Sequence, residues 1–405
     1  MSELYQLPDG WEWKKLDSVG KLFSGSSAPQ KEEYFMNGKY PFIRTRDLAT
    51  FGRTNNLTDV NDYLNDKCVD ENKLILAKKG TILFPKSGAS IGTNNRAMIG
   101  FDSYIVSHLG AFYSNEEVTN RYVYNFFLTI DLLEYCENPS YPSLKISRIK
   151  DIEIPFPPLP EQQRIVLKLD ALFEKIDKAI ALHVKNMEEA DAFMGSVLND
   201  VFGDLEEKYG LQSLSTVVKI NSGIALPSIF KDKETTKGEY EFFKVAQMNN
   251  DNRVMKNADL NFTLSQSKEL KIKLFPKGSI LIPKRGGAIL TNKKRIMERE
   301  ASYDSNIMGL KADNKILSDE FLFAFLKSID LSNYIDTTTI PQVNNKHIDM
   351  MNISIPPLQV QQKVVTYLDE ISQKIEKIKQ LQKEKLSSLK ALKASILDQA
   401  FRGKL

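Results

Sequence analysis

The strongest constraint on the fold of this 405-residue chain is a repeat within its own sequence. The segment GTILFPKSGASIGTN (80–94) returns as GSILIPKRGGAILTN (278–292), with nine of fifteen positions carrying the same residue type 198 positions later. An enzyme seldom needs two copies of one loop, whereas a molecule that contacts two similar objects does. The repeat predicts two domains of one fold, in a chain that is long for a single core.

The repeat is not confined to this loop. A proline pair followed by two glutamines occurs in PPLPEQQ (157–163) and again, 199 positions later, in PPLQVQQ (356–362). The chain is therefore a unit of about 200 residues that has been duplicated. The remaining matches are LDSVGKLFSG (16–25) with LSTVVKINSG (214–223), YPFIRTRDL (40–48) with YEFFKVAQM (240–248), and SVLNDVF (196–202) with SILDQAF (395–401).

Each unit has the same internal order. Short β-rich runs such as TILFP (81–85) and SILIP (279–283) alternate with turns and are followed by an aromatic helical stretch, which predicts a mixed α/β globule. After each proline pair, apolar residues recur every three or four positions, which predicts a long helix. The economical way to bury two such stripes is to pair the helices, so the expected class is α+β: two globules, each followed by a long helix, with the helices forming an antiparallel coiled coil of pseudo-two-fold symmetry. The stripe residues are Ile165, Leu169, Leu172, Ile176 and Ala179 in the first helix, and Val364, Leu368, Ile371, Ile375, Ile378, Leu389, Leu392 and Ile396 in the second.

Composition excludes several classes of protein. With 42% hydrophobic and 26% charged residues and no apolar run near twenty residues, the sequence is typical of a soluble globular protein rather than a membrane protein. The first residues lack the pattern of a secretory signal, so a cytoplasmic protein is expected. Two cysteines without CxxC spacing and three scattered histidines leave no set of ligands for a metal.

The net charge of +3 is small, but cations gather around the repeated loop in both halves. Such clusters favour a polyanion, although each cluster taken alone is also consistent with a solvated lysine-rich surface. Cations hold phosphates, and Asn, Gln, Arg and Lys read base edges, so the mixture suits sequence-specific DNA binding. The candidate DNA-binding residues are Arg44, Arg46, Lys86, Ser87, Asn94, Asn95, Arg96 and Lys145 in the first half, and Lys244, Gln247, Lys284, Arg285, Asn292, Lys293, Lys294, Gln342 and Asn344 in the second.

A catalytic interpretation has little support. The stretch NPSY (138–141) is near the N-P-P-[YF] loop of amino-group DNA methyltransferases, but Ser140 replaces the second proline and no F-x-G-x-G loop precedes it. No phosphate-binding, zinc-protease or hydrolase motif occurs in a credible context. The alternatives that remain are an adenine methyltransferase and a coiled-coil scaffold that binds only protein.

Several motifs resemble the specificity subunit of Type I restriction-modification systems. These are LPDGWEWKKLDSVGKLFSG (7–25), the repeated G-x-I-L-x-P-K-x-G, the two proline-glutamine helix starts and the terminal ILDQAFRGKL (396–405), and the resemblance covers essentially the whole chain. Two departures are that the second helix start reads PPLQVQQ and that the second unit lacks counterparts of Trp11 and Trp13. The resemblance assigns 1–157 and 204–355 to two target-recognition domains, and 158–203 and 356–405 to the central and C-terminal helices.

The resemblance also implies a function. Each target-recognition domain would read one half of a split, non-palindromic DNA site, and the helices would set the spacing and dock two methyltransferase subunits. Restriction/translocase subunits would then join. The chain itself would have no catalytic residue and no cofactor, because S-adenosylmethionine, ATP and Mg are expected only on the partner subunits. The expected location is the cytoplasm of a bacterium or archaeon, at the nucleoid.

Overall fold

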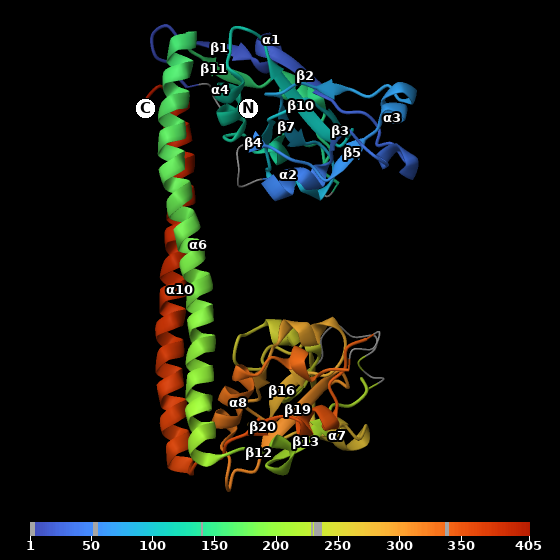
Figure 1. Cartoon of the computed structure of the whole chain (residues 1–405), viewed down its shortest axis with the longest axis vertical. Helices are drawn as coiled ribbons and strands as arrows, with labels where there is room; N and C mark the ends of the chain where they lie inside the picture. Colours follow the sequence, from blue (N-terminus) through green and yellow to red (C-terminus); the bar gives the residue numbers. More distant parts are fainter. Residues whose placement is uncertain (1–4, 52–55, 139–140, 228–229, 231–236, 337–339) are drawn as a thin grey trace. The chain divides into compact units, whose positions relative to one another are not determined.

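The computed structural model describes residues 5–51, 56–138, 141–227, 230, 237–336 and 340–405. The chain divides into two compact units, one made of 1–183 with 384–405 and the other of 184–383 (Figure 1). Each unit contains one globule together with part of each long helix, α6 (Leu159–Tyr209) and α10 (Leu358–Phe401). The compact units therefore do not coincide with the linear succession of globule and helix.

The globule of the first unit is built on a five-stranded sheet in the order β2-β10-β7-β8-β4, beside a four-stranded sheet in the order β5-β3-β9-β6. A third sheet pairs β1 with β11. The strands are β1 (Glu12–Lys15), β2 (Gly20–Ser24), β3 (Tyr40–Ile43), β4 (Asn56–Leu57), β5 (Asp62–Leu64), β6 (Leu76–Ala77), β7 (Ile82–Pro85), β8 (Ala97–Ile99), β9 (Ser103–Ile105), β10 (Leu109–Ser114) and β11 (Glu153–Phe156). The short helices are α1 (Leu16–Val19), α2 (Thr45–Phe51), α3 (Asp66–Glu71), α4 (Asn120–Phe127) and α5 (Ile146–Lys150), with 3₁₀ helices η1 (Glu32–Phe35), η2 (Ala89–Thr93) and η3 (Leu132–Tyr135).

The second unit repeats this plan, with nine strands among its described residues. Its sheets have the orders β13-β19-β16-β17, β15-β14-β18 and β12-β20. The strands are β12 (Gln212–Ser213), β13 (Val218–Ser222), β14 (Tyr240–Phe243), β15 (Leu260–Phe262), β16 (Ile280–Pro283), β17 (Arg295–Ile296), β18 (Ser302–Tyr303), β19 (Ile307–Ala312) and β20 (Asn352–Ile353). The helices are α7 (Leu264–Glu269), α8 (Asp319–Ser328) and α9 (Asn345–Asp349), with 3₁₀ helices η4 (Leu214–Thr216), η6 (Val245–Asn249), η7 (Gly287–Thr291) and η8 (Leu331–Tyr334).

The central strand of each globule is buried on both faces, which explains its continuous apolar sequence. In β7, Ile82 and Phe84 belong to the cluster that reaches α4 and the long helices, whereas Leu83 points into a second cluster beneath β3. In β16, Ile280 and Leu281 divide in the same way between two clusters. Successive side chains of a strand point to opposite faces, so a run of apolar residues fits a strand with two covered faces.

The long helices run antiparallel, as predicted. In the first unit Asp177 of α6 accepts from Lys393 of α10 at 2.8 Å, and in the second unit Asp191 accepts from Lys379 at 2.7 Å. A residue fourteen positions later in α6 therefore pairs with a residue fourteen positions earlier in α10.

The predicted apolar stripes are partly confirmed. Ile165, Leu169 and Ile176 are buried, but Ile378 is 45% exposed and Leu392 is 48% exposed. Phe173, which the stripe missed, is 1% exposed and belongs to the core of the first unit. Helix α6 continues to Tyr209, past the predicted end at 203. It ends there because Gly210 has φ +70°, a left-handed conformation that terminates a helix.

A buried glutamine fixes the start of each long helix to its own globule. Gln162 is fully buried; its Nε2 donates to the carbonyls of Pro157 (3.0 Å) and Glu117 (3.2 Å), and its Oε1 accepts from the N–H of Thr119 (3.2 Å). Thr119 is the N-cap of α4. The glutamine therefore joins α6 to the residue that caps the start of α4.

A buried glutamine has the same role in the second unit. Gln361 is also fully buried, donates to the carbonyls of Pro356 (2.8 Å) and Ile316 (2.7 Å), and accepts from the N–H of Ser318 (2.9 Å), the N-cap of α8. The neighbouring Gln362 is exposed, as Gln163 is in the first unit. The repeated glutamine pair thus contains one structural residue and one surface residue.

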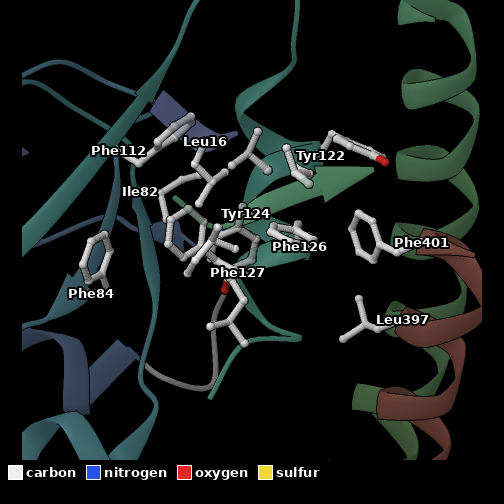
Figure 2. Packing of buried hydrophobic residues seen from close by; sticks show 14 of the residues in the cluster. Leu16, Ile82, Phe84, Phe112, Tyr122, Tyr124, Phe126, Phe127, Leu397 and Phe401 are labelled. Atoms are coloured by element: carbon white, nitrogen blue, oxygen red, sulfur yellow. The ribbon is translucent and has the colours of Figure 1, made fainter. Parts of the chain in front are cut away.

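The end of each long helix packs on the globule of the unit that contains it. In the first unit the ring of Phe401, at the end of α10, lies 5.2 Å from that of Tyr122 and 5.4 Å from that of Phe126, both on α4 (Figure 2). In the second unit Phe202 of α6 lies 5.5 Å from both Phe321 and Phe325 of α8. Each globule is therefore held by the start of one long helix and the end of the other.

Within the described residues, no helix combines the length and the apolar character that crossing a membrane requires. The same part of the chain contains no group of three or more His, Cys, Asp or Glu side chains placed to hold a metal ion.

Candidate nucleic-acid interface

The repeated loop pairs with a second loop in each unit. In the first unit the N–H of Gly88 donates to the carbonyl of Pro142, and the N–H of Leu144 donates to that of Lys86, both at 2.9 Å. We call these two segments, 86–88 and 142–144, the paired loops of the first unit.

The paired loops of the second unit, 284–286 and 341–343, have the same bonds. The N–H of Gly286 donates to Pro341, and that of Val343 donates to Lys284, again at 2.9 Å. In both units, the same backbone hydrogen bonds therefore join two loops that are far apart in sequence. These bonds place Ser87 opposite Ser143 and Arg285 opposite Gln342.

Several of the repeated residue types are required by the backbone itself. Gly88 and Gly286 have φ of +73° and +76°, and Asn94 and Asn292 have φ of +51° and +52°. Glycine and asparagine are the residues that adopt positive φ most readily. The identity of these positions in the two units therefore has a conformational reason that is independent of any ligand.

A buried cation follows each of these asparagines and serves the fold. Arg96 is 3% exposed and donates to the carbonyls of Phe127 (3.2 Å) and Ile130 (2.8 Å), at the end of α4. Lys294 is 4% exposed and donates to Asn292 Oδ1 (2.5 Å) and the carbonyl of Ile329 (2.6 Å), just after α8. A cation at the end of a helix satisfies carbonyls that have no partner within the helix.

Three predicted DNA-binding residues are thus buried. Arg96 and Lys294 have the structural role just described. Gln247 is 5% exposed; it accepts from the N–H of Lys244 at 2.7 Å and donates to Asp259 at 2.7 Å. Because their polar atoms are turned inward, the structure argues against Arg96 and Gln247 as DNA contacts, and Lys294 offers at most part of its ammonium group.

The burial of Lys294 makes the stability of the second unit depend on pH. Burial, with repulsion from Lys327 and partial compensation by Asp330, lowers the pKa of Lys294 to about 8. Above that pH the folded state has lost a proton that the unfolded chain retains up to about pH 10.4, so the free energy of unfolding rises with pH in this window. We expect Lys294 to contribute a gain of about 1–2 kcal/mol between pH 8 and 9.5.

The matched variant is Lys294→Arg, because the first unit carries arginine at this position. Burial lowers the pKa of Arg96 only to about 10, so an arginine should stay charged through most of this window. Urea unfolding of the wild type and the variant, followed by circular dichroism at pH 8 and pH 9.5, should show the gain in the wild type alone. An equal change in both proteins would contradict the assignment.

The lysines of the paired loops have the same setting in both units. Lys86 Nζ donates to Ser24 Oγ, and Lys284 Nζ donates to Ser222 Oγ, both at 3.0 Å. Neither lysine is fully buried, so each ammonium group is oriented by a neighbouring strand and keeps contact with solvent.

The next position differs between the units. Ser87 lies 2.5 Å from His108 Nδ1, whereas its counterpart Arg285 is exposed. The remaining predicted residues beside the paired loops are Lys145, which pairs with Glu137 at 2.7 Å, Gln342, which is partly exposed, and Asn344, the N-cap of α9. The structure therefore brings together Lys86, Ser87 and Lys145 in the first unit, and Lys284, Arg285, Gln342 and Asn344 in the second.

Other predicted residues lie in different surroundings. Arg44 and Arg46 both pair with Asp62, Arg46 at 2.7 Å, so this arginine pair is partly neutralised. In the second unit Lys244 follows β14 and Lys293 donates to Asn249. Asn95 is partly exposed, and its carbonyl accepts from Arg96 at 3.4 Å.

Two exposed apolar residues lie beside the paired loops and were not predicted from the sequence. Tyr141 is 83% exposed and Ile340 is 57% exposed, and each directly precedes the proline whose carbonyl accepts from the repeated glycine. The shared signal is a large apolar residue before proline at equivalent positions of the two units. Ser140, in the NPSY stretch that resembles a methyltransferase loop, lies outside the described residues.

The family comparison covers both units. The model of the Type I restriction modification DNA specificity domain matches residues 8–186 and 207–386. A putative Type I restriction enzyme specificity subunit of Haemophilus influenzae is 23% identical over 89% of this chain and 87% of that protein. The MjaIX specificity subunit of Methanocaldococcus jannaschii is 33% identical, but the match spans only 42% of this chain and 39% of that protein.

Solved structures agree on the fold. A chain from a structure titled for complex assembly and conformational transition of the Type I R-M system superposes with a TM-score of 0.75, at 21% identity, over 99% of this chain and 100% of that one. The HsdS subunit from Thermoanaerobacter tengcongensis has a TM-score of 0.51 at 20% identity, over 100% and 99% of the two chains. The duplicated globules, the long helices and a family match over both units lead to one conclusion: this chain belongs to the family of Type I restriction-modification DNA specificity domains, the DNA-recognising and non-catalytic part of such systems.

Proposed function

We propose that this chain is the specificity subunit of a Type I restriction-modification complex, and that its two globules read the two halves of a bipartite, non-palindromic DNA site. The observation that carries the proposal is the paired loops, which have one backbone in both units but different exposed side chains. Ser87 in the first unit is replaced by Arg285 in the second, and Ser143 by Gln342. Loops with the same backbone conformation but different side chains suit two domains that approach DNA in the same way and recognise different bases.

The lysines and the arginine have different proposed roles. Lys86 and Lys284 are the same residue on the same serine partner, so we assign them to phosphate, which is present at every sequence. Arg285 differs from its counterpart and is exposed, so we assign it to a base edge, where arginine donates bidentately to guanine.

The long helices supply the proposed docking surface for two methyltransferase subunits, with restriction/translocase subunits joining the assembly. Beyond the apolar residues that hold the helices together, others remain exposed and would be covered if partner subunits packed along the helices. In the first unit these include Leu167 (72% exposed) and Leu182 (61%), and in the second Phe193 (56%) and Tyr367 (50%).

An exchange of residues 1–157 for those of another family member tests the two-reader proposal. Methylated adenines should be mapped genome-wide in cells that carry the complex with either the wild-type or the exchanged chain. We expect one half of the recognised motif to change while the other half stays constant. If both halves changed, the division of reading between the globules would be wrong, and if no methylation depended on this chain, the proposed function itself would fail.

Two point variants separate phosphate contact from base reading. Arg285→Ala should cost about 1–3 kcal/mol at one base pair of one half-site and relax the preference there. Lys284→Ala should weaken binding to all sequences and reduce the slope of log K against log salt by about one. The measurement is binding of the assembled complex to a panel of single-base variants at several salt concentrations.

Ser87→Ala is the matched control in the first unit, and it should leave the half-site read by the second unit unchanged. An unchanged motif with Arg285→Ala would remove its assignment as a base reader. An unchanged salt slope with Lys284→Ala would remove its phosphate contact.

A further inference from the structure

A pocket of about 300 Å³ lies in the second unit, between the globule and the part of α6 that belongs to the same unit. Lys294, Arg295 and Lys327 contribute to its wall on the globule side, and Asp191 and Leu198 contribute to its wall on the helix side. The pocket is separate from the paired loops. Three cations and one carboxylate at a single pocket give it an excess of positive charge.

The three cations lack anionic partners of their own. Among the residues that the structure describes, Lys294, Arg295 and Lys327 take part in no ion pair, although Lys327 is close enough to lower the pKa of Lys294 and Arg295 is close enough to lower that of Lys327. Asp191, the carboxylate of the pocket, already pairs with Lys379 at 2.7 Å. Lys327 is exposed, but Lys294 and Arg295 are buried, and buried charges without a counter-ion are costly, so an anion from outside the chain would lower that cost.

The nearby carboxylates of the globule are also engaged elsewhere. Asp251, whose charge acts on Arg295, pairs with Lys256 at 2.5 Å. Asp330, whose charge acts on Lys294, accepts from the N–H of Ser332 at 2.9 Å. Neither carboxylate comes within ion-pair distance of a pocket cation in the described structure.

Hydrogen-bond donors remain available at this pocket. Lys294 uses two of its three N–H groups, on Asn292 and Ile329. Arg295 is 8% exposed; its Nη1 donates to the carbonyl of Lys294 at 2.7 Å, while its Nε is buried and has no partner among the described residues. A buried donor without an acceptor is unusual in a folded protein and is often explained by a bound ion or water.

The first unit lacks this charge pattern. At the positions equivalent to Arg295 and Lys327 it carries Ala97 and Leu128, and only the buried Arg96 corresponds to Lys294. Arg96 donates to two carbonyls and to Asn94, so its guanidinium is largely satisfied within the globule. The repeated fold therefore does not need Arg295 or Lys327, and their presence calls for a reason specific to the second unit.

We propose that Lys294, Arg295 and Lys327 form a binding site for a phosphate-class oxyanion in the second unit. The group bound is tetrahedral and negatively charged, and it is supplied either by the backbone of DNA or by a free phosphate-type anion. Only the first of these sources rests on the proposed function, because the site itself is defined by the cations of the pocket. The lysines provide charge, and the guanidinium of Arg295 provides directed donors.

Titration of the full-length chain with sulfate and with inorganic phosphate, followed by calorimetry, tests the site. We expect saturable binding that becomes about tenfold weaker in Lys327→Leu and in Arg295→Ala, each of which introduces the residue type of the first unit. Lys293→Ala is the matched control, because it removes one charge from the same loop without removing a residue that lines the pocket. Thermal unfolding without added anion checks that each variant is folded.

Two kinds of outcome would overturn the proposed anion site. Absence of saturable binding in the wild type, or equal affinity in wild type, Lys327→Leu and Arg295→Ala, would overturn the site. A loss that Lys293→Ala reproduces would also overturn it, because the effect would then reflect only the overall charge.

DNA binding by the assembled complex identifies the source of the anion. If DNA supplies the phosphate, Lys327→Leu should weaken binding to every sequence and lower the salt slope by about one, and sulfate should compete with DNA. If a free anion is the ligand, Lys327→Leu should lose sulfate affinity and keep its DNA affinity; both results support the site. Sulfate binding in a chain whose complex does not recognise DNA would defeat the proposed function and leave the site intact.

Discussion

Replacement of Gln162 by leucine is expected to destabilise the first unit by about 3–5 kcal/mol, because it leaves three backbone groups without partners. The carbonyls of Pro157 and Glu117 and the N–H of Thr119 all bond to this fully buried side chain. Leucine has a similar size but can neither donate nor accept a hydrogen bond. In the variant all three backbone groups would therefore remain desolvated without a partner, which lowers the free energy of unfolding. The same argument applies to Gln361→Leu in the second unit, where the corresponding distances are 2.7–2.9 Å.

The adjacent glutamine provides the control. Gln163 is exposed, so Gln163→Leu should change the free energy of unfolding by no more than about 0.5 kcal/mol. Both tryptophans, Trp11 and Trp13, belong to the first unit, so their fluorescence during urea unfolding reports on that unit. Equal stability of Gln162→Leu and Gln163→Leu would show that the buried glutamine does not hold the helix to the globule.

Truncation of Phe401 to alanine is expected to cost about 3–5 kcal/mol, because it removes a buried aromatic side chain near the end of α10. The ring is 3% exposed and lies against Tyr122 and Phe126 of α4 (Figure 2). The hydrogen bond from Tyr5 to the backbone carbonyl of residue 401, at 2.7 Å, does not involve the side chain, so the loss should come from packing.

Two further variants calibrate this prediction. Leu392→Ala changes the same helix at a position that is 48% exposed and should cost well under 1 kcal/mol. Phe202→Ala in the second unit should cost less than Phe401→Ala, because Phe202 remains partly exposed. The measurement is again urea unfolding, with circular dichroism for the second unit. A cost for Phe401→Ala no larger than that for Leu392→Ala would contradict the proposed anchoring of α10.

Most of the architecture could be predicted from periodicity. The runs TILFP and SILIP became the central strands β7 and β16, and the stretches after the proline pairs became α6 and α10. These predictions succeeded because alternation and helical spacing depend on local geometry, which a single sequence contains. Phe173 was missed because the outer part of a stripe is buried only where a globule covers it.

The candidate interface was predicted less well, for a reason visible in the repeated loop itself. Positions that are identical in both units include Lys86 and Lys284, which remain accessible, and Asn94 and Asn292, which are required by a left-handed backbone conformation. A residue repeated for its backbone and a residue repeated for its ligand give the same pattern in sequence. Arg96 and Lys294 entered the predicted set as cations clustered beside the repeated loop, and only their burial separates them from the surface cations.

The sequence by itself determined the duplication, the α+β class, the starts of the two long helices and the region of the repeated loops. These properties follow from residue type and spacing along the chain. Only the tertiary structure decided which glutamine of each pair is buried, which cations face inward, and that 86–88 and 142–144 form one pair of loops. It also brought Lys294, Arg295 and Lys327 to one pocket, because burial and proximity arise when segments far apart in sequence pack together, and no local pattern records which side of a residue that packing will cover.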